Sequence, residues 1–185
     1  RTYQFEKFVG EMKFALDQAI VILQRTPGTI KSLIENLGEN WTNANEGPET
    51  FSPFDVVGHL IYGEKTDWVV RAKIILQGTN QKTFEPFDRF AQERESKGKS
   101  LNQLLTEFEF LRNENIYWLN EQNLSTKDLE RTGIHPTLGA VSLKHLLACW
   151  VVHDLTHIAQ ITRVMAKQYK DEIGPWTEFF RILNF

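Results

Sequence analysis

The sequence of 185 residues lacks the marks of several protein classes. It has one cysteine, Cys149, so no internal disulfide can form, which is typical of a protein in a reducing cytoplasm. Its 21 Lys and Arg residues against 24 Asp and Glu residues give a net charge of −3, whereas a nucleic-acid-binding protein usually carries a basic excess. The longest apolar runs, such as residues 20–23, are far too short to span a bilayer. We therefore expect neither a nucleic acid nor a membrane as partner.

No stretch near the first residue has the charged and apolar regions of a signal peptide, which together with the cysteine usage favours a cytoplasmic protein. The apolar fraction of 41% is ordinary for a globular protein, and the length predicts one domain over residues 1–185. Cys149 lies among apolar residues of a predicted helix, so we expect it to be an unreactive core residue.

Strand-like alternation, internal repeats and low-complexity stretches are also missing, and the apolar residues recur instead at helical spacing. This pattern predicts long helices over about residues 5–37, 52–78, 100–120 and 142–168. Pro27 interrupts the first, which is either two helices or one kinked helix. Serines that can cap a helix stand at the starts of the other three. The pattern predicts an all-α fold, a four-helix bundle with one or two long connections.

The predicted connections differ in length. Residues 79–99 form a long polar connection, which we interpret as a crossover or as part of a pocket rim. Residues 125–128 begin a short helical turn, and residues 135–139 contain the proline and glycine of a turn. A final short helix is expected over residues 176–183.

Two histidines, His153 and His157, stand four residues apart in the last long helix. Positions at this spacing share one face of a helix, with Cβ atoms about 5–6 Å apart. The face is also the apolar stripe that an amphipathic helix turns inward. Two neutral imidazoles in a core need polar partners, and one metal ion would satisfy both. The alternative is a pair on a solvated face, because such spacing alone is weak evidence.

His59, near the start of the second long helix, is the candidate third ligand, because bundles build metal sites from inward side chains of facing helices. Three histidines and a water make the open coordination of a catalytic zinc site. Imidazole also suits nickel, copper and iron, so the ligand type does not name the metal. His135, in a turn, and His145, two turns before His153, are weaker candidates.

These residues belong to a wider pattern. The sequence resembles the DinB-like superfamily of metal-binding four-helix bundles, relatives of bacterial thiol-dependent transferases. The resemblance implies that His59, His153 and His157 bind a divalent metal, often nickel or zinc. It departs from the family at Phe51, where tryptophan is frequent, and after His157, where a basic residue is frequent. The stretches that carry it are ILQRTP (22–27), FSPFDVVGHL (51–60), GIHPTLGAVSL (133–143) and VHDLTHIAQI (152–161).

Our leading functional hypothesis is a metal-dependent transferase that attaches a low-molecular-weight thiol to electrophilic small molecules. A divalent ion in an open three-histidine site lowers the pKa of a coordinated thiol or water, which gives a nucleophile at neutral pH. One alternative is a metal-dependent hydrolase, in which water replaces the thiol. Another is a bundle without turnover, in which the metal only stabilises the fold.

Three further residues are candidates for the surroundings of the metal. Asp154 follows His153 but points about 100° away from it on a helix, so it is expected to orient or cap a neighbouring group. Gln160, one turn after His157, is expected to line the pocket. Arg71 is expected either to meet an anionic cofactor or to form a surface ion pair with Asp67.

The end of the chain is unusually apolar. The resemblance implies that a homodimer can form through the faces of the bundle, and this cluster could contribute to it. The alternative is that the cluster folds back onto its own core. Its members are Trp176, Phe179, Phe180 and Phe185.

Overall fold

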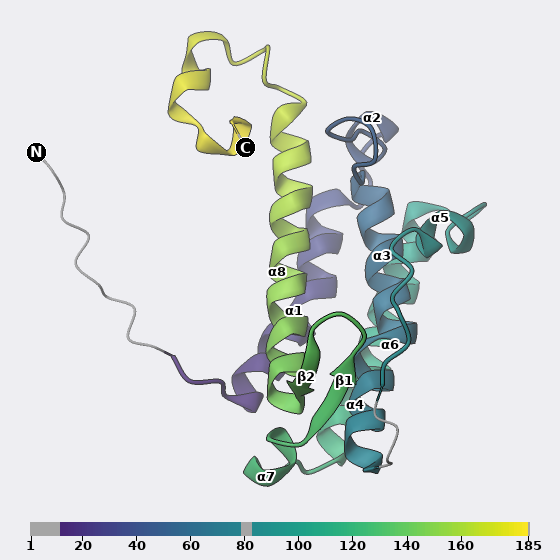
Figure 1. Cartoon of the computed structure of the whole chain (residues 1–185). Helices are drawn as coiled ribbons and strands as arrows, with labels where there is room; N and C mark the ends of the chain where they lie inside the picture. Colours follow the sequence, from purple (N-terminus) through teal and green to yellow (C-terminus); the bar gives the residue numbers. More distant parts are fainter. Residues whose placement is uncertain (1–11, 79–82, 185) are drawn as a thin grey trace, which may run out of the picture.

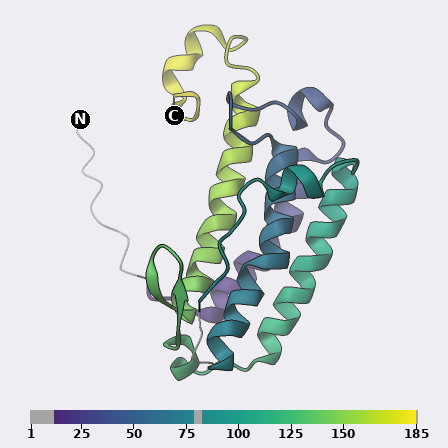
Figure 2. The same ribbon diagram turned by 45° about the vertical axis from the view of Figure 1, so that its right-hand side comes forward.

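The structure is a computed structural model that describes residues 12–78 and 83–184. Four long helices run side by side along most of their length (Figures 1 and 2). The four helices are α1 (Leu16–Ile34), α3 (Pro53–Thr66), α6 (Leu101–Glu121) and α8 (Leu143–Lys167). In the packing of the bundle, α3 lies against α6, and α1 lies against both α6 and α8. The predicted four-helix bundle is therefore confirmed.

The first helix is continuous. Pro27 lies inside α1, so the interruption in the sequence does not divide it. A proline inside a helix removes one backbone hydrogen bond, and the packing of α1 against α6 and α8 offsets this loss. Phe5 and Phe8, with which the predicted helix began, lie outside the described residues.

The second predicted helix is in fact two. After α3, the backbone at Asp67 (φ −112°, ψ −76°) departs from regular helical values, and α4 (Trp68–Gln77) follows. The start of α3 is the predicted one. There Ser52 and Asp55 form a capping box, in which the Asp55 N–H donates to Ser52 Oγ at 3.2 Å and the Asp55 carboxylate accepts from the Ser52 N–H at 3.0 Å.

A β-hairpin corrects the expectation that no strands would form. β1 (Thr132–His135) and β2 (Gly139–Ser142) pair antiparallel, with His135 opposite Gly139. Strands of four residues are too short to produce a periodic signal in the sequence, which explains why they were missed. The turn itself lies where it was predicted, and Gly139 adopts a positive φ of 74° there. The hairpin leads directly into α8, because Ser142 is also the N-cap of that helix.

The connections contain short helical segments. One of them, α5 (Ala91–Glu95), packs closely on α3 at Gly58, where any Cβ would collide with the Ser96 hydroxyl. Phe179 and Trp176 are exposed, whereas Leu183 is buried beside α8. Phe185 lies outside the described residues. None of the described helices is long and apolar enough to cross a membrane. The short segments are α2 (Glu39–Thr42), α5 (Ala91–Glu95), α7 (Thr126–Leu129) and two 3₁₀ turns, η1 (Gly174–Phe179) and η2 (Arg181–Leu183).

An ionic network lies buried inside the bundle. The side chains of Arg112, Glu64 and Asp154 are fully inaccessible to solvent. Arg112 Nη2 donates to Glu64 Oε1 at 2.7 Å, Nη1 donates to Asp154 Oδ2 at 2.6 Å, and Nη1 also donates to the carbonyl of Leu23 at 2.7 Å. Trp150 Nε1 donates to Glu64 Oε1 at 3.2 Å. The network thus connects all four long helices through α1, α3, α6 and α8.

Candidate metal centre

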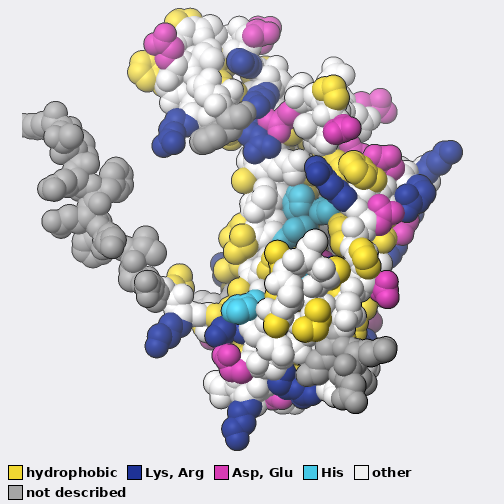
Figure 3. All heavy atoms as spheres, viewed as in Figure 1, with side chains coloured by type: hydrophobic (Ala, Val, Ile, Leu, Met, Phe, Trp, Pro, Cys, Tyr) yellow, Lys and Arg dark blue, Asp and Glu magenta, His cyan; other side chains and the backbone are white. Residues whose placement is uncertain are grey.

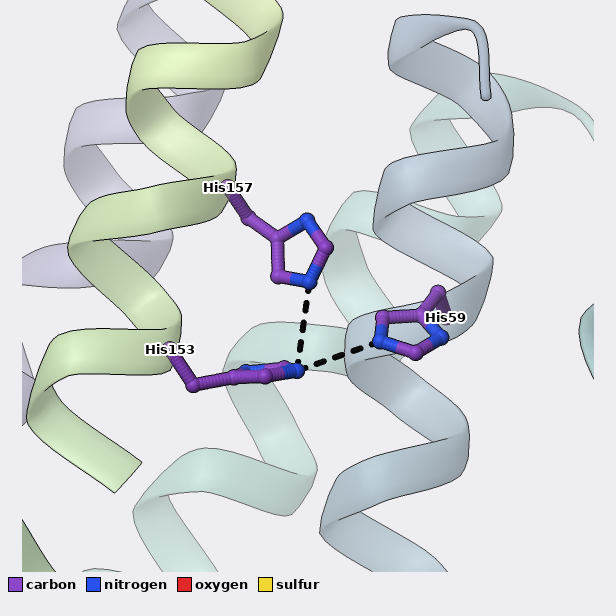
Figure 4. A group of neighbouring side chains, drawn as sticks. All are labelled: His59, His153 and His157. Carbon is purple, nitrogen blue, oxygen red and sulfur yellow. Dashed lines mark hydrogen bonds between the residues drawn. The ribbon is translucent and has the colours of Figure 1, made fainter. Parts of the chain in front are cut away.

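Three histidines from two facing helices converge. His59 projects from α3, and His153 and His157 project from α8 toward it (Figure 4). The Nε2 atom of His153 lies 3.1 Å from Nε2 of His59 and 3.1 Å from Nε2 of His157. Within the described part of the chain, this is the only group of three or more His, Cys, Asp or Glu residues close enough to share one metal ion.

The nitrogen spacing fits a divalent ion. At a zinc–nitrogen distance of about 2.0–2.1 Å, two ligands lie roughly 2.9 Å apart at a right angle and roughly 3.3 Å apart at the tetrahedral angle. The two separations of 3.1 Å fall between these limits. Nitrogen donors of this kind suit zinc, nickel, copper and iron. Two of the three nitrogen separations therefore match a shared divalent ion, and the three ligand atoms all lie within 4.8 Å of one another.

Burial keeps the three imidazoles neutral. It lowers the pKa of His59 to about 4 and that of His153 to about 2, and it also lowers the pKa of His157. The proximity of the rings to one another adds to the effect for His59 and His153. At neutral pH each ring therefore has a free lone pair, which is the form that binds metals.

Gln160 fixes the orientation of one ring. His157 Nδ1 lies 2.9 Å from Gln160 Oε1, and an amide oxygen can only accept, so the imidazole proton is on Nδ1. The Nε2 lone pair of His157 then faces the other two rings. The Nδ1 atoms of His59 and His153 are buried and have no hydrogen-bond partner among the described residues. A single proton shared between two of the three Nε2 atoms leaves the third without a hydrogen-bond partner, whereas one cation can interact with the lone pairs of all three.

A cavity of about 620 Å³ opens beside the histidines. Its walls are mostly apolar and come from α3, α4, the hairpin, α8 and residues 84–89, so part of the long connection forms the pocket rim. In Figure 3 histidine side chains are visible on this face, with basic and apolar side chains near them. The apolar wall residues are Phe51, Trp68, Phe84, Phe87, Leu138, Val141 and Leu146.

Most of the other residues predicted from the sequence also lie at this cavity. Gln160 and Arg71 line it. Arg71 forms an ion pair with Asp67, and both side chains are buried at the cavity wall and not on the surface. Burial raises the pKa of Asp67 to about 6, against the opposing effect of Arg71. Both weaker histidine candidates, His135 and His145, lie in the cavity wall and outside the converging group.

Asp154 points away from the cavity, as expected from its place on the helix. Its carboxylate is turned into the bundle and both of its oxygens accept from Arg112, so the group it orients is that arginine. One expectation needs correction. Cys149 is exposed at the cavity and is not a core residue. Its flank of α8 faces the space between α4 and the hairpin, which sequence periodicity did not reveal. Burial of its sulfur still raises the pKa of the Cys149 thiol, so it stays protonated at neutral pH.

The sequence analysis did not identify two arginines, Arg112 of the buried ionic network and Arg89 at the cavity. Arg112 could have been found, because it follows Phe108 by four residues and so falls on the inward stripe of α6. Arg89, which lines the cavity, follows Pro86 in a stretch without regular structure, and no sequence pattern places it there.

Comparison with known proteins identifies the fold and the family of the chain. The solved structure described as "YfiT from Bacillus subtilis is a probable metal-dependent hydrolase with an unusual four-helix bundle topology" matches with a TM-score of 0.71. The match covers 92% of this chain and 95% of that chain at 21% sequence identity, a level that shows a shared fold. Among curated proteins, none matches the chain. The sequence model of the DinB superfamily matches residues 22–161, most of the chain, and the protein therefore belongs to the DinB superfamily.

Proposed function

We propose that this protein is a divalent-metal-dependent enzyme in which His59, His153 and His157 hold a zinc or nickel ion. We further propose that it transfers a low-molecular-weight thiol to electrophilic small molecules. The observation that carries the proposal is the convergence of three neutral Nε2 atoms, 3.1 Å apart in two pairs, beside a cavity of about 620 Å³.

The proposed reaction uses a coordination position that the three histidines leave open on the metal ion. A divalent ion on three imidazoles has room for a thiol or a water and lowers its pKa, which supplies a nucleophile at neutral pH. The protein's own residues hold the ligands in place. Gln160 holds His157 by a hydrogen bond, and the rings of Phe51 and Trp68 lie 5.5 Å and 5.0 Å from those of His59 and His153.

The size and the walls of the cavity favour two reactants. Cavities of roughly 300–1,000 Å³ accept drug-sized ligands, whereas a single water occupies about 30 Å³. A volume of about 620 Å³ therefore has space for both a thiol and an electrophile. Apolar and aromatic walls also limit the access of water, which would otherwise compete with the thiol as nucleophile.

Metal-dependent hydrolysis is the second candidate. The observation that favours it is the shared fold with YfiT, which its description calls a probable metal-dependent hydrolase. The same three histidines would then serve the activation of water. In that case turnover of esters or amides proceeds without any added thiol.

Metal content is the first test. Elemental mass spectrometry on untagged protein is expected to find about one divalent ion per chain, lost in His153→Ala and in His157→Ala, because a site of two imidazoles binds far more weakly. His145→Ala is the matched control, since His145 lies in the same cavity wall but outside the converging group. Absence of metal from the wild type after incubation with zinc and nickel would overturn both candidate functions.

Activity separates the two candidates. We expect the metal-loaded protein to conjugate a chromogenic electrophile with cysteine or glutathione, and a chelator or His153→Ala to abolish the reaction. Hydrolysis of a nitrophenyl ester without thiol, together with no conjugation, would establish the hydrolase instead.

A further inference from the structure

Two arginines line the cavity, and their environments differ. Arg71 is buried and neutralised by the Asp67 carboxylate. Arg89 is exposed at the cavity, and among the residues that the structure describes no carboxylate lies within ion-pair distance of it. A second arginine of the same segment, Arg94, is also exposed but pairs with Asp88 at 2.6 Å and does not line the cavity. Arg89 is thus the cavity arginine whose charge is available to a ligand.

Aromatic rings hold the Arg89 guanidinium. Its central carbon lies 5.6 Å from the ring centre of Phe51 and 5.5 Å from that of Phe90. A guanidinium beside aromatic rings is attracted to their π-electrons, and this attraction does not use its N–H groups as donors to a carboxylate. This arrangement limits the freedom of the side chain before any ligand arrives, so less entropy is lost on binding.

The position of Arg89 relates it to the three histidines. Phe51 is buried, and its ring centre lies 5.5 Å from that of His59, so the same aromatic side chain lies next to both Arg89 and one of the three histidines. Both Arg89 and the histidines face the same cavity. A small molecule can therefore meet the guanidinium and the metal centre at the same time.

We propose that Arg89 binds the carboxylate of a small amphipathic substrate, whose apolar body lies along the aromatic cavity wall and whose reacting group meets the three histidines. This inference rests on the proposed function of the site and names its substrate class. The planar edge of a guanidinium matches a carboxylate through two parallel hydrogen bonds. The apolar side chains that surround the cavity select a body of aromatic or aliphatic carbon.

The test compares two probes of the same shape. Para-fluorophenylpropionate carries a carboxylate, and para-fluorophenylpropionamide is its uncharged counterpart. Fluorine NMR titration of the zinc-loaded protein is expected to show that the carboxylate binds at least about tenfold more tightly than the amide, as a charge-assisted hydrogen bond requires. Arg89→Gln is expected to remove this preference, and Arg89→Lys to retain part of it. Arg94→Gln, the matched control, is expected to retain all of it.

Two outcomes would overturn the inference. One is a carboxylate preference that survives in Arg89→Gln but disappears in His153→Ala, which would mean that the carboxylate binds at the histidines. The other is no preference in the wild type, or no binding of either probe. Zinc content is measured on the same samples, so loss of the metal site is distinguished from loss of the carboxylate site.

Discussion

Replacement of Arg112 by methionine tests the interpretation of the buried network. Methionine fills much of the arginine's length but leaves the carboxylates of Glu64 and Asp154 without their cation, in a place that water does not reach. Removal of one partner from a buried ion pair typically costs about 3–5 kcal/mol. A domain of this size loses roughly 2–4 °C of melting temperature per kcal/mol, so we expect a decrease of roughly 6–20 °C.

The same variant has a distinctive pH dependence. Burial raises the pKa of Glu64, and Arg112 opposes this rise, so the arginine's removal raises the pKa further. A carboxyl whose pKa is higher in the folded state than in the unfolded state contributes stability at low pH and loses it as pH rises through the folded value. The deficit of Arg112→Met relative to the wild type should therefore be larger at pH 8 than at pH 5.

Thermal denaturation measures the decrease in melting temperature, and urea denaturation at pH 5 and pH 8 measures the pH dependence. Both are followed by circular dichroism, in buffer with a chelator so that metal binding does not add to stability. Arg94→Met is the control, because the Arg94 side chain is 69% exposed and its removal should leave the midpoint unchanged. A midpoint equal to that of the wild type, or a deficit that is the same at both pH values, would refute the argument that Arg112 compensates buried charge.

Three other predictions concern the site and the chain end. Burial lowers the pKa of His59 from 6.5 to about 4, so between these pH values the unfolded chain binds more protons than the metal-free folded protein, and the free energy of unfolding should fall by about 3 kcal/mol as pH falls through this window. Thermal denaturation of the wild type and of His59→Phe measures this loss, and an equal loss in both proteins would contradict the prediction. Gln160→Ala loses the 2.9 Å hydrogen bond to His157 and should weaken metal affinity by about 10–100-fold in chelator competition, while an unchanged affinity would show that Gln160 does not orient the ring. Trp176 and Phe179 are exposed, so we expect light scattering to find a homodimer that Phe179→Ser weakens, and a monomeric wild type would disprove this.

Local signals accounted for what could be predicted from the sequence. Ser52, Ser100 and Ser142 each form a capping box with the residue three positions later, and helix starts set by such neighbours are visible in sequence alone. The spacing of His153 and His157 likewise places both on one face of α8. His59 was added because bundles build sites from facing helices, and the structure brings all three together.

What was missed depends on contacts between distant segments. The exposure of Cys149 follows from the gap that α4 and the hairpin leave beside α8, and no pattern within α8 encodes that gap. The hairpin is too short for a periodic signal, and Arg89 owes its position to Phe51 and Phe90. The sequence therefore indicated which side chains could bind a metal, while the shape and charge of the cavity became visible only in three dimensions.

The distance along the chain between the ligands has a consequence for how the protein matures. His59 lies 94 residues before His153, and α8, which holds two of the three histidines, is the last long helix. The ribosome completes α8 after every other helix of the bundle, and α1, made first, cannot bury its face against α8 until then. The three histidines can therefore converge only late in the biogenesis of the protein. Under the proposed function, a cell that runs short of metal would accumulate chains that gain activity when metal returns, without new synthesis.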